Sequence, residues 1–237
     1  MRIHPNPKRK VKLRTQKEAI EVLKLVKKSV IEKTALQNIS SGENSTPFKV
    51  LVSTMLSART RDMVTEAASA RLFKKFPDSK ALSHARTAEV SRQIYPVSFY
   101  RTKAKRIIEV ARIIESQYRG VTPRIMEELL TLPGVGRKTA NCVLVYAYNT
   151  PAIPVDVHVH RISNRIGLVT TKTPEETERE LSKLYEQKYW LAVNELFVKF
   201  GQTICKPIVP RCGICDVRTL CNYYQNLVKT SKRPASA

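Results

Sequence analysis

Two charged residues stand where an ordinary apolar core would favour neither. Lys138 begins an apolar helical stretch directly after the sequence LPGVG, and Asp156 lies in a run of Pro, Ile and Val. A lysine in the first helical turn lies at the positive end of the helix dipole, which is expected to lower its pKa. Because only the neutral amine attacks an electrophile, this position indicates a nucleophile.

The chain length between these residues allows the carboxylate to reach the amine. A helix over 138–148 is about 16 Å long, and the eight residues 149–156 extend up to roughly 26 Å. Asp156 delivered beside Lys138 would accept the lysine proton, or stabilise a cationic sugar as a bond to it breaks. A second interpretation is equally open, because Asp156 also suits the cap of a helix that begins near Val157.

The turn before the lysine contains Gly134 and Gly136. Both are expected where a tight turn needs a positive φ or a close backbone approach. The exposed amides at the start of the following helix would then bind a phosphate. A plain turn is the alternative meaning of this short pattern.

The charge of the chain bears on that choice. Lys and Arg number 42 against 20 Asp and Glu, which gives a formal net charge of +22. Such an excess attracts a polyanion, most commonly nucleic acid, although a basic solubility surface or a membrane-surface protein is the alternative. No apolar run approaches a membrane span, and the N-terminus lacks the apolar core of a secretory signal. We therefore expect an intracellular protein of the cytoplasm or nucleoid, without a membrane.

Four of the five cysteines form a C-x6-C-x2-C-x5-C pattern near the C-terminus. They are Cys205, Cys212, Cys215 and Cys221. Two disulfides would be unusual inside a cell, and a structural zinc site typically has two C-x2-C pairs where this loop has one. Four thiolates at unequal spacing suit an iron–sulfur cluster. The spacing alone leaves zinc and the cluster open.

Two cations, Lys206 and Arg211, lie between the first two of these cysteines. A metal-bound loop would hold them rigidly against a phosphate backbone. They would also offset the negative charge of the thiolates, and the two roles are compatible. The fifth cysteine, Cys142, lies on the apolar helix after Lys138 and is expected to fill the core.

The hydrophobic pattern is helical almost throughout and strand signals are few, so the predicted fold class is all-α. An N-terminal helix is predicted over 16–33, and Thr46 before Pro47 predicts the start of the next one. Helices are then predicted at 47–57, 61–75, 87–95, 103–118, 124–130 and 137–148.

The C-terminal half continues the helical pattern. A helix is expected to start near Val157, and the sequence TPEE predicts a capping box in which Glu176 reaches back to Thr173. Helices from there to about residue 200 lead into the cysteine-rich loop.

Five motifs occur in one order along the chain: LSARTRD (56–62), FYRTKAKRI (99–107), LPGVGRKTAN (132–141), VDVHVHRISNR (155–165) and the four-cysteine loop. Together they resemble the endonuclease III family of DNA glycosylases, which are helix-hairpin-helix proteins with an iron–sulfur cluster. The resemblance covers residues 20–224 and favours a 4Fe–4S cluster over zinc.

The resemblance implies the helix-hairpin-helix DNA glycosylase fold. A six-helix barrel is expected over 40–150, and the basic N-terminal arm and helix of 1–39 would join 151–225 in a second helical domain. The cluster loop would occupy 205–221 in that domain, and 226–237 would form a flexible tail. The substrate cleft would lie between the two domains.

The resemblance also implies the activity. The chain would be a base-excision-repair DNA glycosylase and AP lyase, with Lys138 as nucleophile and Asp156 as catalytic carboxylate. A damaged, oxidised pyrimidine flips out of the duplex, and Lys138 attacks the sugar to form a Schiff base. β-Elimination then cleaves the strand 3′ of the abasic site. The expected partner is double-stranded DNA with damaged bases or abasic sites, bound by a monomer.

Two further residues are expected to fill the gap that a flipped nucleotide leaves. Arg59 stands where the best-known bacterial members have glutamine, and Phe99 matches an apolar wedge that is often leucine. A plain surface or core role is the alternative for each. The full set of predicted DNA contacts is Arg59, Phe99, Gly134, Gly136, Arg137, Lys206 and Arg211.

Two other classes of protein compete with this interpretation. A non-enzymatic DNA binder explains the charge and the turn but not Lys138 with Asp156. A redox-responsive iron–sulfur regulator would need an exposed, labile cluster, whereas this cysteine loop follows a long helical domain. Nicking of abasic-site DNA separates all three.

Overall fold

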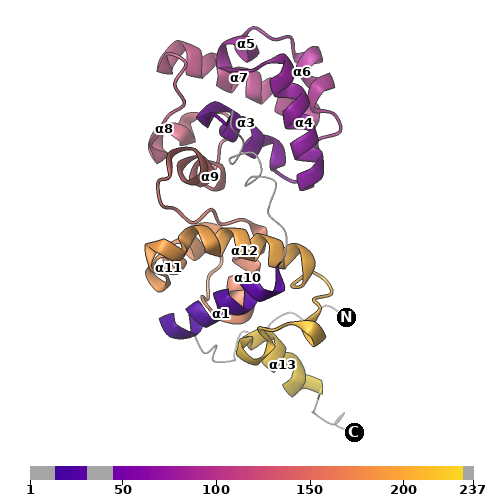
Figure 1. The fold of residues 1–237 in the computed structure, drawn as a ribbon, viewed down its shortest axis with the longest axis vertical. Helices are drawn as coiled ribbons and strands as arrows, with labels where there is room; N and C mark the ends of the chain where they lie inside the picture. The colour runs from indigo at the N-terminus through magenta and orange to yellow at the C-terminus, as the bar shows by residue number, and fades with distance from the viewer. Residues whose placement is uncertain (1–13, 31–44, 232–237) are drawn as a thin grey trace. The chain divides into compact units, whose positions relative to one another are not determined.

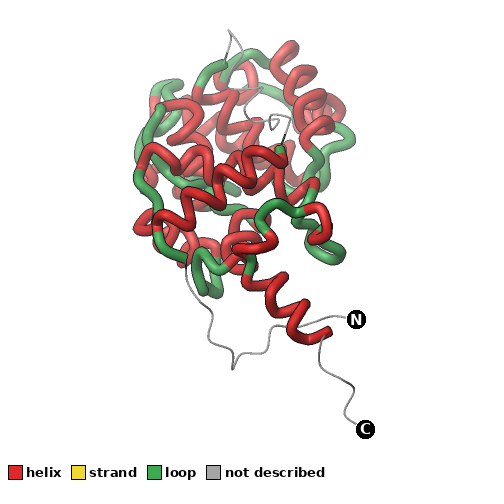
Figure 2. Tube along the Cα trace, turned by 60° about the horizontal axis from the view of Figure 1, so that its bottom comes forward, coloured by secondary structure: helices red, strands yellow, loops and turns green. Residues whose placement is uncertain are grey.

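The computed structural model describes residues 14–30 and 45–231 (Figure 1). Every regular element in these residues is a helix, which confirms the all-α class (Figure 2). None of the helices described is both long and apolar enough to cross a membrane. The chain divides into two compact units, a central unit within 33–154 and a terminal unit within 1–32 and 155–237.

The central unit is built from helices that follow one another closely along the chain. In its described residues they are α3 (Pro47–Ser57), α4 (Asp62–Lys75), α5 (Ser79–Ser83), α6 (Thr87–Ile94), α7 (Tyr100–Tyr118), α8 (Met126–Thr131) and α9 (Arg137–Tyr148). Two of the predicted ranges, 47–57 and 137–148, agree with the structure at both ends, whereas α7 begins three residues before the predicted 103. The short α5 was not predicted.

The core of the central unit forms around α3. This helix is buried on nearly all sides, and it packs against α4, α7 and α9, while α7 also packs against α5 and α6. Thr46 caps α3 as predicted, since its side chain accepts a hydrogen bond from the Lys49 N–H at 3.3 Å. The apolar α3 therefore provides the support from which α7 and α9 present their first turns.

The terminal unit combines the N-terminal helix with the C-terminal part of the chain. Its described elements are α1 (Gln16–Ser29), α10 (Val157–Ile166), α11 (Pro174–Leu184), η1 (Gln187–Tyr189), α12 (Trp190–Thr203), η2 (Cys212–Ile214), η3 (Arg218–Leu220) and α13 (Asn222–Ser231). The indigo α1 lies along the orange α12 in Figure 1, and the buried Tyr185 hydroxyl donates to the Ala19 carbonyl at 3.0 Å. Segments from both ends of the chain thus share one core.

Two predicted boundaries near the ends of the chain differ from the structure. The helix predicted over 16–33 ends at Ser29, with Val30 as its C-cap, and 31–33 lie outside the described residues. The tail predicted over 226–237 is helical as far as Ser231, because α13 continues through it. The remaining residues 232–237, like the predicted basic arm before Arg14, lie outside the described part.

The predicted capping box at α11 is half correct. Thr173 accepts a hydrogen bond from the Glu176 N–H at 3.2 Å. The Glu176 carboxylate, however, accepts from the Lys172 N–H at 2.7 Å, one residue before the cap. This bond holds the pKa of Glu176 below its usual value.

A glycine sets the close packing of α10 against α12. A Cβ added at Gly201 would lie 2.5 Å from His158 Nδ1 and 2.9 Å from Arg161 Nη2. Any larger residue would force the two helices apart. The crossing at Gly201 therefore fixes α10, the helix that Asp156 caps and that carries the arginines described below.

Candidate active site and cysteine-lined pocket

The hairpin turn between α8 and α9 presents the first turn of α9. Gly134 has φ +80, and a Cβ there would lie 2.9 Å from Arg106 Cδ. The positive φ expected from the sequence is therefore present at Gly134. The turn is closed by the Val135 N–H on the Leu132 carbonyl at 3.0 Å.

The corresponding expectation for Gly136 was wrong. Gly136 is the N-cap of α9 with φ −98 and ψ 175, which is extended backbone open to any residue. A Cβ added there would meet nothing within 4 Å. Because Gly136 has no side chain, the space in front of the first backbone amides of α9 stays open.

Lys138 is the second residue of α9 and is half-buried, next to the exposed Arg137. The face of α9 that starts at Ala140 is buried against the core of the central unit. This packing fixes the position of the first turn of α9, which contains Lys138. Cys142 is 0% exposed, which confirms that it fills the core.

Asp156 caps α10, as one of its two interpretations predicts. Its Oδ1 accepts hydrogen bonds from the His158 N–H at 2.8 Å and the Val159 N–H at 2.9 Å. Both bonds use the same oxygen, and the described residues place no further hydrogen bond on Oδ2. The cap therefore orients the carboxylate and leaves one oxygen for chemistry.

The two residues belong to different compact units. Lys138 lies in the central unit and Asp156 in the terminal unit. Each unit positions its own residue through a helix start: the hairpin and α9 for the amine, the cap of α10 for the carboxylate. Their pairing stays a prediction.

Arg59 and Phe99 have the same unusual backbone conformation. Both lie in the left-handed region, with φ 56 at Arg59 and φ 57 at Phe99, which side chains other than glycine seldom adopt. Arg59 is exposed just after α3, and Phe99 is 64% exposed at the start of α7. Phe99 is therefore not a core residue. The loop that contains Arg59 and the loop that contains Phe99 each present an exposed side chain from a strained backbone position.

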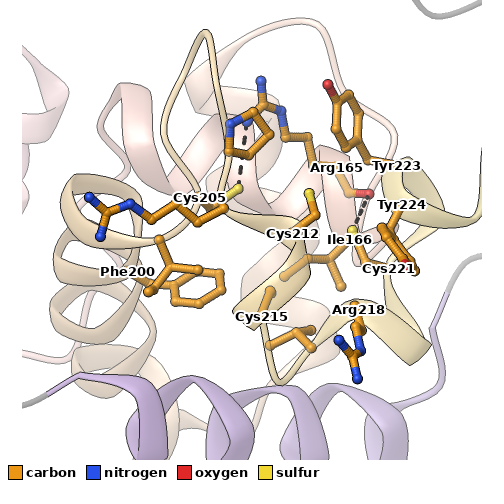
Figure 3. Close-up of a pocket in the computed structure, with 14 residues that line it drawn as sticks. Arg165, Ile166, Phe200, Cys205, Cys212, Cys215, Arg218, Cys221, Tyr223 and Tyr224 are labelled. Carbon is orange, nitrogen blue, oxygen red and sulfur yellow. Dashed lines mark hydrogen bonds between the residues drawn. The ribbon is translucent and has the colours of Figure 1, made fainter. Parts of the chain in front are cut away.

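The four predicted metal-binding cysteines line one pocket in the terminal unit (Figure 3). Cys205 follows α12, Cys212 begins η2, Cys215 follows it, and Cys221 follows η3. Two short 3-10 turns thus bring the C-terminal cysteines back to the end of α12. All five cysteines lie in the described residues, and none forms a disulfide.

Two arginines of α10 hold the loop that contains these cysteines. Arg161 Nη2 donates to the Cys205 carbonyl at 2.8 Å. Arg165 donates to the Lys206 carbonyl at 2.8 Å and the Pro207 carbonyl at 2.6 Å, and its Nη1 lies 3.6 Å from Cys205 Sγ. Sequence reasoning missed both residues, although their spacing of four places them on one helix face.

The thiols surround the pocket without converging on one point. Among the described residues no three His, Cys, Asp or Glu side chains form a group that would hold a metal ion as they stand. Burial raises the pKa of Cys212 and Cys215, and raises that of Cys221 to about 11. Burial thus favours the neutral thiol at these three positions.

The predicted phosphate contacts of this loop differ in exposure. Lys206 is half-buried and Arg211 is exposed, while the Arg211 N–H donates to the Ile204 carbonyl at 2.9 Å. This bond closes the segment between the first two cysteines. The loop therefore presents both cations next to the cysteine pocket.

Comparison with known proteins agrees with this architecture. Residues 52–187, more than half of the 237-residue chain, match the HhH-GPD superfamily of base excision DNA repair proteins. Endonuclease III of Thermotoga maritima is 48% identical over 187 residues, which is 79% of this chain and 88% of that protein.

Two solved structures share the fold. An endonuclease III in a non-covalent complex with DNA matches with a TM-score of 0.81 at 29% identity, covering 92% of this chain and 100% of that chain. A trapped covalent endonuclease III–DNA intermediate matches with a TM-score of 0.79 at 28% identity, covering 91% and 100%. The chain therefore belongs to the HhH-GPD superfamily and, within it, to the endonuclease III family of DNA glycosylases with AP lyase activity.

Proposed function

We propose that the chain removes oxidised pyrimidines from duplex DNA with Lys138 as the nucleophile, and then cleaves the strand at the resulting abasic site. The observation that carries this proposal is the place of Lys138. It stands half-buried in the first turn of α9, directly after the hairpin, in a fold that matches a trapped covalent endonuclease III–DNA intermediate. An amine held at a helix start, beside amides that suit a phosphate, is placed to attack a sugar.

The chemistry follows from an amine nucleophile. Neutral Lys138 attacks the anomeric carbon of the flipped nucleotide, and the glycosidic bond breaks with its electron pair leaving on the base. The C1′–O4′ bond then breaks, which opens the sugar ring and leaves a Schiff base between C1′ and the lysine nitrogen. Loss of a proton from the neighbouring C2′ expels the 3′ phosphate oxygen by β-elimination, and water finally releases the lysine.

Asp156 assists from the cap of α10. Its Oδ1 accepts hydrogen bonds from the His158 and Val159 amides, so the carboxylate has a fixed orientation and Oδ2 is left for the reaction in this proposal. That oxygen would accept the proton of Lys138 or stabilise the cationic sugar. The same residue therefore has a structural and a chemical role.

The remaining predicted contacts divide by position. The amides after Gly136, with Arg137, would bind a phosphate, and Arg59 and Phe99 would fill the gap left by the flipped nucleotide. Lys206 and Arg211 would contact the backbone from the cysteine loop. A single copy of the chain, acting inside the cell in the cytoplasm or at the nucleoid, would suffice for this reaction.

The four cysteines are proposed to hold a 4Fe–4S cluster. One zinc ion would need all four sulfurs at about 2.3 Å from a single point. A cluster instead bonds each thiolate to a separate iron, so side chains spread around a pocket suit it better than a lone ion. When bound, the cluster would fix the loop that presents Lys206 and Arg211.

A nicking assay tests the proposed function. The protein is incubated with duplex DNA containing an oxidised thymine, and separately with duplex containing an abasic site. The wild type should nick the modified strand of each duplex, and Lys138→Gln should nick neither duplex while still binding both. Binding without nicking by the wild type would make the protein a DNA binder and overturn the proposal.

A further inference from the structure

One lysine outside the proposed active site donates hydrogen bonds to the C-terminal end of α3. Lys103 lies in the first turns of α7 and is half-buried. Its ammonium group donates to the Leu56 carbonyl at 2.7 Å and to the Ala58 carbonyl at 2.6 Å. These are the carbonyls at the C-terminal end of α3, which has no basic residue in its own last turn. A cation there stabilises the negative end of the helix dipole.

The same ammonium group reaches the residue after Arg59. Lys103 Nζ lies 3.3 Å from Thr60 Oγ1. Ala58 and Thr60 flank Arg59, whose φ of 56 is strained. Lys103 therefore fixes the chain on both sides of Arg59.

Thr60 also forms a hydrogen bond with the loop that contains Phe99. Its hydroxyl accepts a hydrogen bond from the Ser98 N–H at 3.2 Å. The backbone of Lys103 also contacts this loop, since the Lys103 N–H donates to the Phe99 carbonyl at 3.0 Å. The Lys103 and Thr60 contacts thus join the two loops whose central residues, Arg59 and Phe99, both have left-handed backbones.

Lys103 is therefore not available as a phosphate contact. An ammonium group has three N–H donors, and the three acceptors named above use all of them. Burial lowers the pKa of Lys103 to about 8. Its neighbour Lys105 on α7 is exposed and offers a matched comparison.

We propose that Lys103 is a positioning residue that couples the Arg59 loop to the Phe99 loop and thereby sets the selectivity for the base opposite the lesion. This inference rests on the proposed function, in which Arg59 and Phe99 fill the gap in the duplex. If the side chains of Arg59 and Phe99 are held in one fixed arrangement, the base opposite the lesion contacts a surface of fixed shape. If the coupling is lost, each loop relaxes separately and the discrimination among opposite bases falls.

The test compares Lys103→Met with Lys105→Met, since each removes one positive charge from α7. Single-turnover excision of an oxidised thymine is measured opposite each of the four bases, and nicking is measured at a preformed abasic site. Lys103→Met should narrow the spread of excision rates among the four duplexes. It should slow excision roughly tenfold or more, the scale on which small misplacements act. Nicking should fall less, because an abasic sugar has no base to unpair.

A second variant and a second readout guard against simple loss of folding. Thr60→Val removes the acceptor shared by Lys103 and the Ser98 N–H but leaves the bonds of Lys103 to the Leu56 and Ala58 carbonyls. Amide hydrogen exchange at Ser98 then reports on the connection without any activity. Exchange should accelerate in Lys103→Met and Thr60→Val and stay unchanged in Lys105→Met.

The outcomes separate the two proposals. A wild type that neither excises nor nicks removes the proposed function, while the Ser98 exchange still decides whether the loops are coupled. Unchanged Ser98 exchange in both variants overturns the coupling. An opposite-base profile in Lys103→Met equal to that of the wild type overturns the proposed selectivity role.

Discussion

The carboxylate of Asp156 both caps α10 and carries a charge, and two substitutions separate these roles. Asp156→Asn keeps an oxygen that accepts from the His158 and Val159 amides but removes the charge. Its stability should stay near that of the wild type, and its excision rate should fall by about two or more powers of ten. Thermal unfolding and single-turnover kinetics measure the two effects.

Asp156→Ala provides the matched comparison, because it removes both the cap and the charge. It should lower the free energy of unfolding by about 1 kcal/mol in addition to the loss of rate. If Asp156→Asn retained the wild-type rate, the carboxylate would have only its capping role.

At the scale of elements, the hairpin before α9 depends on one of its two glycines. Gly134→Ala places a side chain at φ +80 and should destabilise the protein by about 1–2 kcal/mol. The nearby Arg106 side chain can move aside, so the backbone sets the cost. Denaturant unfolding measures the change.

Gly136→Ala is the matched control in the same turn. Its backbone is extended and its surroundings are open, so the free energy of unfolding should be unchanged or slightly increased. A loss of DNA affinity in Gly136→Ala would then report on a contact and not on the fold. Equal destabilisation by both substitutions would contradict the roles given to the two glycines.

The cysteine loop allows a direct test of its proposed cofactor. Protein purified without oxygen should be yellow-brown and contain roughly four irons per chain, because four thiolates suit one cubane cluster. Cys212→Ser should lower the iron content and weaken DNA binding, whereas Cys142→Ser, in the core of the other unit, should leave the iron content unchanged. Stoichiometric zinc in a colourless protein would contradict the cluster.

Element boundaries could be predicted where the sequence carries a strong local signal. The range of α3 is correct because Thr46 and Pro47 mark its start and the helix is almost entirely apolar. The five-residue α5 was missed because one turn shows no periodicity, although the Asp78 cap on the Ala81 N–H was a usable signal. The exact partner of Glu176 depends on loop geometry that spacing does not determine.

At the scale of the whole molecule, the net charge of +22 predicts strongly salt-dependent binding. Each phosphate contact releases counterions, so the affinity for undamaged duplex should fall steeply as salt rises. Lys206→Ala and Arg211→Ala should each flatten the slope of log affinity against log salt by about one unit. Affinity that does not change with salt would point to a different partner.

Contacts between distant segments explain what the sequence did not reveal. Arg161 and Arg165 donate hydrogen bonds to carbonyls of the cysteine loop, about 40 positions away in the sequence. No local sequence pattern indicates which carbonyls these arginines contact. The bond between Lys103 and the end of α3 is of the same kind. The types and spacing of Lys138, Asp156 and the cysteines, by contrast, were visible because they conflict with an ordinary helical core.

Borohydride trapping tests the central claim most directly. Reduction during turnover of a lesion-containing duplex should convert the Schiff base into a stable protein–DNA adduct, and peptide mapping should place it on Lys138. Lys105→Gln, the same change at an exposed lysine of the same unit, should give the wild-type yield. Lys138→Gln should give no adduct although it still binds the duplex. An adduct of wild-type yield in Lys138→Gln would show that another amine is the nucleophile and contradict the account.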